Sequence, residues 1–104
     1  MDRSATIARN IRLRIAMLKA HAPGWTIALA RELAGKSKPM SVGGWGNYAS
    51  GAHHASDAML DRLAHGLWLQ RGGLLLLSAL EVVGLAVDPP VDNYTVNADS
   101  SETR

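Results

Sequence analysis

Glycine and proline residues divide this sequence into short segments, and this division limits what the chain can fold into. Pro23-Gly24, Gly35, Gly72-Gly73 and Pro89-Pro90 separate stretches whose apolar residues recur every three or four positions. The residue before a proline avoids the helical conformation and glycine tolerates turns, so these positions end helices. The apolar spacing is that of helices with one buried face. We therefore predict an all-α fold: a compact bundle of about five helices with a short polar C-terminal tail.

The first predicted helix has an apolar stripe and a basic outer face, and Pro23 and Gly24 end it. A second helix runs from an N-cap at Thr26 to Ala34, with Leu29 and Leu33 on its inner face. Gly35 is a suitable stop. The stripe of the first helix consists of Ile7, Ile11, Ile15 and Leu18, and its outer face carries Arg9, Arg12 and Lys19.

A third short helix is predicted to start at Ser37 or Lys38, because Pro39 is tolerated in a first helical turn. Val42 and Trp45 then lie on one side, and Trp45 is expected to be a core anchor rather than a surface for base stacking. Residues 47–55 are predicted to be a loop. Ser56 caps a fourth helix whose core stripe consists of Met59, Leu60, Leu63 and Leu67.

The segment 72–87 is the only long apolar run of the sequence. It is shorter than the roughly 20 residues of a membrane-spanning helix and it contains Glu81. After a break at Gly72 and Gly73, we predict a largely covered helix over residues 74–85 that pairs two subunits. The predicted organisation is a helical domain, 1–87, followed by a polar tail, 88–104, with no membrane partner.

The charges of the chain are unevenly distributed although their sum is only +2. Residues 1–38 contain eight Lys and Arg against two acidic residues, whereas residues 39–104 contain three against seven. A basic half favours an anionic partner, with nucleic acid the first expectation. The chain has no cysteine and Arg3, Arg9, Arg12 and Arg14 interrupt any apolar leader, so a reducing cytoplasm is the expected compartment.

Three fragments carry a resemblance to a known family. Leu29-Ala30-Arg31-Glu32-Leu33 is followed by Ser41-Val42-Gly43-Gly44-Trp45-Gly46-Asn47, and then by Gly51 and Leu60-Asp61-Arg62-Leu63-Ala64. In their order along the chain and in the residue types that they contain, these fragments resemble the lambda-repressor-like (Cro-type) helix-turn-helix family over residues 10–67. The stretch from Leu33 to Trp45 is about two residues longer than in the family, and the loop after Trp45 about three residues longer.

This resemblance implies a repressor-like transcription regulator that binds operator DNA as a homodimer, with the third helix in the major groove. Lys36 and Lys38 precede that helix and are suited to phosphates, with Lys38 also able to reach guanine acceptors. Ser41 is the best candidate for a base-edge contact, and the glycines let the backbone approach a groove. The expected DNA-binding residues are Lys36, Lys38, Met40, Ser41, Gly43, Gly44, Asn47, Tyr48, Arg12 and Lys19.

Two alternatives follow from the same residues. Because the third helix has few long polar side chains, the scaffold is also suited to binding a protein partner, as a phage-type or antitoxin-like modulator. His53, Asp57, Asp61 and His65 recur every four residues, a spacing that could hold a metal ion, although a solvated acidic helix face explains it more simply. No arrangement of catalytic residues is evident, and we expect neither an enzyme nor a cofactor or metal.

Overall fold

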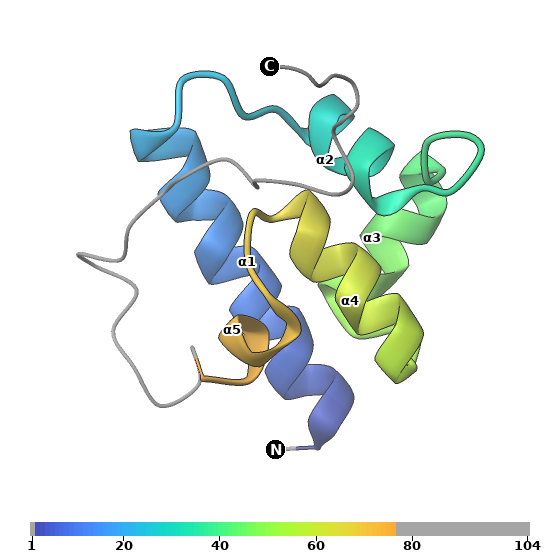
Figure 1. The fold of residues 1–104 in the computed structure, drawn as a ribbon. Coiled ribbons are helices and arrows are strands. Elements are labelled where there is room, and N and C mark those ends of the chain that lie inside the picture. The colour runs from blue at the N-terminus through green and yellow to red at the C-terminus, as the bar shows by residue number, and fades with distance from the viewer. Residues whose placement is uncertain (1, 77–104) are drawn as a thin grey trace.

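In the computed structural model, residues 2–76 are described, and they form five helices and no strand (Figure 1). The all-α prediction is thus confirmed for this part of the chain. Most of the predicted helix 74–85, and the tail 88–104, lie outside the described residues. The helices are α1 (Arg3–His21), α2 (Ile27–Ala34), α3 (Val42–Ser50), α4 (Asp57–Gly66) and α5 (Arg71–Leu76).

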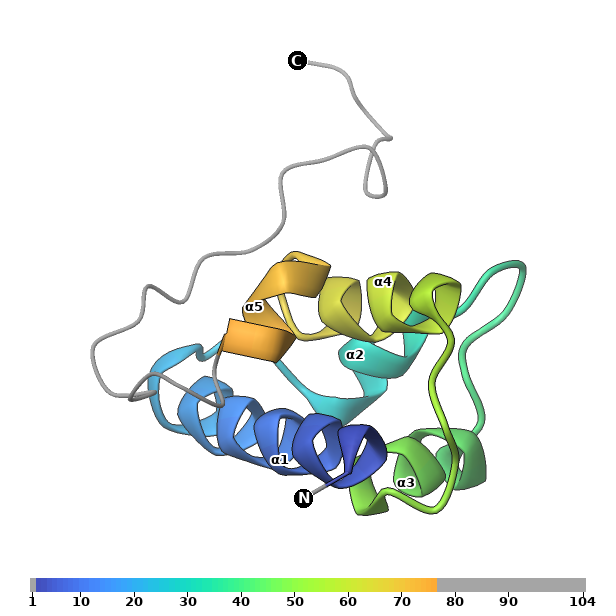
Figure 2. The same ribbon diagram turned by 90° about the horizontal axis from the view of Figure 1, so that it is seen from below.

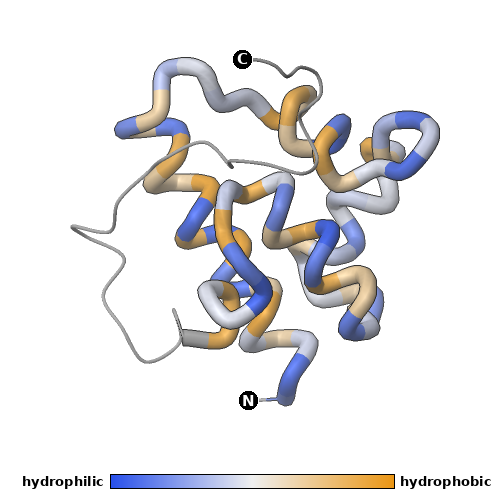
Figure 3. Tube along the Cα trace, viewed as in Figure 1, coloured by the Kyte–Doolittle hydropathy of each residue, from blue (hydrophilic) through white to orange (hydrophobic). Residues whose placement is uncertain are grey.

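The helices enclose one core between two layers. In one layer α1 packs against α3, and in the other α2 packs against α4, while α5 contacts both α1 and α4 (Figure 2). Hydrophilic and hydrophobic segments alternate along α1 and α4, as expected for helices with one buried side (Figure 3). Every layer contributes to the core, whose largest members include Ile7, Ile11, Leu18, Trp25, Trp45, Leu60, Leu63, Leu67 and Leu74.

A polar side chain caps each of the first four helices. Asp2 accepts a hydrogen bond from the Ala5 backbone N–H, and the predicted caps Thr26 and Ser56 accept from residues 29 and 59. Ser41 does the same for Gly44 at the start of α3. Such a cap stabilises a helix by about 1 kcal/mol, so these local signals fix where the helices begin.

Residues 36–41 form a loop, so the predicted start of the third helix at Ser37 or Lys38 is wrong. The Met40 backbone N–H donates to the Arg31 carbonyl at 2.9 Å, and Arg31 Nε donates to the Met40 carbonyl at 2.7 Å. This pair holds Met40 against α2, and the helix begins only at Val42. The helix also continues to Ser50, through the first part of the predicted loop 47–55.

Side-chain burial corrects two further expectations and confirms one. On α2, Ala30 and Ala34 form the buried face, whereas Leu29 and Leu33 are only half-buried, because α2 approaches α4 closely. Val42 is 69% exposed and does not share the side of Trp45. Trp45 itself is buried as predicted, at 5% exposure.

Gly72 and Gly73 lie inside α5, so the predicted break at these residues is wrong. Each glycine costs about 1 kcal/mol of helix propensity relative to alanine, and tertiary contacts must offset this cost. Leu74 provides one such contact, because its side chain is fully buried and its carbonyl accepts a hydrogen bond from Asn10 Nδ2 of α1.

Arg14 is fully buried, unlike the other arginines of α1. Its Nε donates to the Leu67 carbonyl at 3.0 Å and its Nη2 to the Trp68 carbonyl at 3.2 Å. Trp68 has a φ of 57°, a conformation that L-residues rarely adopt, so this turn between α4 and α5 needs such support. Arg14 therefore joins α1 to the turn and does not belong to the basic outer face.

Candidate functional site

A cavity of about 440 Å³ lies beside the loop between α2 and α3. Four of the predicted DNA-binding residues line it, two of them lysines, together with Arg62 of α4. The lining residues are Lys36, Ser37, Lys38, Pro39, Met40, Ser41 and Arg62. The structure thus brings the start of α3, the loop and α4 to one place.

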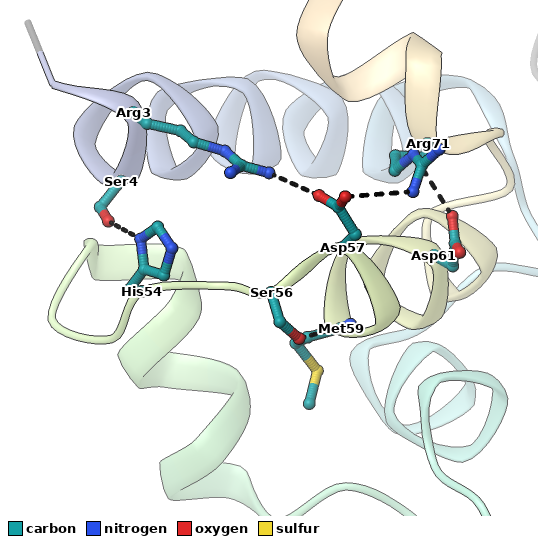
Figure 4. A network of polar contacts seen from close by, with 8 residues as sticks. All are labelled: Arg3, Ser4, His54, Ser56, Asp57, Met59, Asp61 and Arg71. Carbon is teal, nitrogen blue, oxygen red and sulfur yellow. Dashed lines mark hydrogen bonds and ion pairs between the residues drawn. The ribbon is translucent and has the colours of Figure 1, made fainter.

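The two lysines of this cavity are exposed, and neither forms an ion pair within the described residues. By contrast, Asp57 pairs with Arg3 at 3.0 Å and with Arg71 at 3.9 Å, and Asp61 pairs with Arg71 at 3.7 Å (Figure 4). These pairs join the starts of α1 and α5 to the first two turns of α4. Two of the four carboxylates in residues 2–76 are therefore paired with cations that do not line the cavity.

Residues 2–76 carry a clear excess of positive charge, with ten Lys and Arg against four Asp and Glu. This excess is larger than that of the whole chain, because Glu81 and the acidic residues after it lie outside the described part. Lys36 and Lys38, which form no ion pair within residues 2–76, thus belong to a part of the chain with excess positive charge, and such a charge distribution attracts an anionic partner.

Two arginines hold the loop between α2 and α3 by donating a hydrogen bond from Nε to a backbone carbonyl, one within the loop and one just before it. Arg31 binds the Met40 carbonyl, and Arg62 Nε donates to the Ala34 carbonyl at 2.7 Å. Ala34 is the last residue of α2, so Arg62 also satisfies a carbonyl at a helix C-terminus, where a cation is favourable. Both arginines are half-buried.

The predicted residues at the start of α3 differ in accessibility. Ser41 is exposed, and its Oγ accepts from Gly44 N at 3.0 Å, which leaves the hydroxyl proton available to a ligand. Met40 is buried at 8% exposure and also lines the cavity. Gly43 is exposed. Gly44 is half-buried, and an added Cβ there would lie 3.0 Å from Ser41 Oγ.

The remaining predicted residues lie farther from the cavity. Asn47 and Tyr48 are half-buried in the later turns of α3, where the Tyr48 ring lies 5.7 Å from that of His53. Arg12 Nη1 donates to the Ala49 carbonyl at 2.9 Å, near the C-terminus of α3. Lys19 is in the last turn of α1, at the opposite side of the molecule from the α2–α3 loop in both views (Figures 1 and 2).

Arg62 was not predicted as a site residue, although it lines the cavity. One signal was available, because Arg62 is the only Lys or Arg between Lys38 and Arg71. The alternative metal row is not assembled: His53 lies in a loop, His65 is buried in α4, and residues 2–76 contain no group of three or more His, Asp or Glu placed to hold a metal ion.

None of the helices in residues 2–76 is both long and apolar enough to cross a membrane. Comparison with known proteins finds no matching family, no similar curated protein and no similar solved structure.

Proposed function

We propose that this protein binds double-stranded DNA through the α2–α3 loop and the exposed side of α3. In this proposal it is a sequence-specific, repressor-like regulator that occupies operator DNA as a homodimer. The observation that carries the proposal is the pair of exposed lysines, Lys36 and Lys38. They lack a carboxylate partner within the described residues, and they precede a helix, α3, whose first two residues are exposed. The resemblance of the sequence to helix-turn-helix repressors supports the same function.

The two parts of this surface have different roles in the proposed complex. Lys36 and Lys38 contact phosphates, which fixes the position of the protein without reading sequence. The first turn of α3 approaches the base edges, where the Ser41 hydroxyl can donate or accept a hydrogen bond. Homodimer formation through residues 74–85 would place two copies of α3 on half-sites about 34 Å apart, or a multiple of this distance.

The test is a salt titration of duplex affinity for a Lys36→Ala/Lys38→Ala variant. The slope of log K against log salt is about −0.9 for each neutralised phosphate, so we expect the slope to become shallower by about 2. Lys19→Ala is the control. The sequence suggested Lys19 as a DNA-binding residue, but the structure places it at an exposed helix end on the far side of the molecule, so removal of its single charge should leave the slope unchanged. Equal loss of slope in the variant and the control would contradict the proposed surface.

A second candidate function, binding of a protein partner, is favoured by one observation. Val42, the first residue of α3, is 69% exposed, and the next two residues are glycines. An exposed valine followed by two residues without side chains is open to an apolar contact. A positive charge placed at residue 42 separates the two functions, because it attracts phosphates and opposes burial in a protein interface.

A further inference from the structure

The guanidinium of Arg62 is held in position but is only partly used. Its Nε bond to the Ala34 carbonyl, at 2.7 Å, fixes the plane of the group, while its terminal nitrogens make no hydrogen bond or ion pair within the described residues. The side chain is half-buried and lines the cavity of Lys36 and Lys38. A guanidinium carries five N–H donors, so four of them remain for a ligand.

We propose that this cavity holds one phosphate group of the DNA backbone and that Arg62 is the residue that fixes its position. The inference rests on the proposed DNA binding, because the phosphate belongs to the duplex. Three cations from two separate parts of the chain, the loop and α4, line one cavity. Its volume of about 440 Å³ is many times the roughly 30 Å³ of a water molecule, so a phosphate and part of its hydration shell can enter.

The chemistry of the three cations favours a phosphate. A guanidinium forms two parallel hydrogen bonds to phosphate oxygens, whereas the ammonium groups of Lys36 and Lys38 act as point charges on flexible chains. Since Arg62 is already oriented by Ala34, it loses less conformational freedom on binding than a free surface arginine does.

This contact would also fix how α4 sits on the duplex. Arg62 belongs to α4, which packs against α2, whereas the lysines belong to the loop that leads into α3. A phosphate bound between them would attach both layers of the domain to the same point of the DNA backbone. Its loss would therefore weaken binding to all duplex sequences alike, since phosphate contacts carry no base information.

The test compares Arg62→Gln with Arg71→Gln in the full chain. Arg71→Gln is the control, because it also removes one guanidinium group, but that group pairs with Asp57 and Asp61 and does not line the cavity. For Arg62→Gln we expect about a tenfold loss of duplex affinity, typical of one hydrogen-bonded charged contact. For Arg71→Gln we expect a loss of no more than about twofold. Equal losses would overturn the inference.

A second measurement uses inorganic phosphate, with the Arg62 Nε–Hε resonance observed by NMR. Duplex and phosphate should both shift this resonance, and phosphate should shift it less in the Lys36→Ala/Lys38→Ala variant. An unchanged resonance at saturating duplex would overturn the inference while leaving the proposed DNA binding intact. A chain that binds phosphate through Arg62 but binds no duplex would overturn both DNA binding and the assignment of the phosphate to a DNA backbone.

Discussion

The close approach of α2 to α4 predicts that Gly66→Ala destabilises the protein. Gly66 is the last residue of α4, and a Cβ added there would lie 2.5 Å from the Ala30 carbonyl oxygen and 3.4 Å from Ala34 Cβ. The first of these contacts involves backbone, so one helix has to move. The Gly66 carbonyl also accepts a hydrogen bond from Trp25 Nε1 at 2.9 Å, and movement of α4 disturbs this bond.

Three effects set the size of the change. Alanine gains about 1 kcal/mol of helix propensity over glycine. Overpacking of a well-packed contact costs about 1–3 kcal/mol. A Cβ only 2.5 Å from a backbone oxygen belongs to the upper part of that range, because the backbone cannot rotate away as a side chain can. Disturbing the Trp25 bond costs about 1 kcal/mol more. We therefore expect a net loss of about 1–3 kcal/mol, which corresponds to a fall in Tm of roughly 4–8 °C for each kcal/mol.

Urea denaturation followed by circular dichroism measures this loss, and Gly46→Ala is its control. Gly46 is also helical, but it is exposed and a Cβ there would meet no atom within 4 Å. Alanine at that position should raise the free energy of unfolding by about 0.5–1 kcal/mol. If Gly66→Ala raised the urea midpoint as Gly46→Ala does, the tight crossing of α2 and α4 would be refuted, and with it the position of Arg62 beside the loop.

Two further predictions concern charge. The hydrogen bond from Arg3 and the charge of Arg71 hold the pKa of Asp57 below its ordinary value, so this carboxylate stabilises the fold at neutral pH, and the stabilisation is lost as the pH falls through and below about 4. Urea midpoints should therefore fall less on acidification in Asp57→Asn than in the original chain; equal falls would contradict this role. Val42→Lys should tighten duplex binding and steepen its salt slope by about 1; weaker DNA binding, with loss of a stoichiometric protein partner, would favour the second candidate function.

Helix positions were largely predictable because their signals are local. The caps Thr26 and Ser56 lie within three residues of the N–H groups that they bind, and both were predicted. The start of α3 was not predictable in this way. Pro39 is compatible with a first helical turn, but the paired hydrogen bonds between Arg31 and Met40, nine residues apart, hold the loop instead.

The candidate site also combines residues that local sequence signals predict with a residue that only the tertiary fold brings to it. Lys36 and Lys38 are adjacent to α3 in sequence, so local charge was enough to predict them, whereas Arg62 reaches the cavity only because α4 packs on α2. The burial of Arg14 had a sequence signal that was missed, because Arg14 lies seven residues, or two helical turns, after Ile7 and so falls on the apolar stripe. From the sequence, only Arg9, Arg12 and Lys19 were placed on the basic face, and Arg14 was assigned to neither face.

The composition of α3 limits how the proposed complex could read DNA. Of its exposed side, Val42, Gly43 and Gly46 offer no side-chain hydrogen bond, and only Ser41 before the helix and Ser50 at its end add hydroxyl groups. A good bidentate base contact is worth about 1–3 kcal/mol, and a serine cannot make one as an Arg or Asn does. Most of the affinity would then come from Lys36, Lys38 and Arg62 on phosphates. Discrimination between DNA sequences would then arise from the fit of the glycine-rich helix in the groove. A second subunit would add its own small free-energy preference at the other half-site.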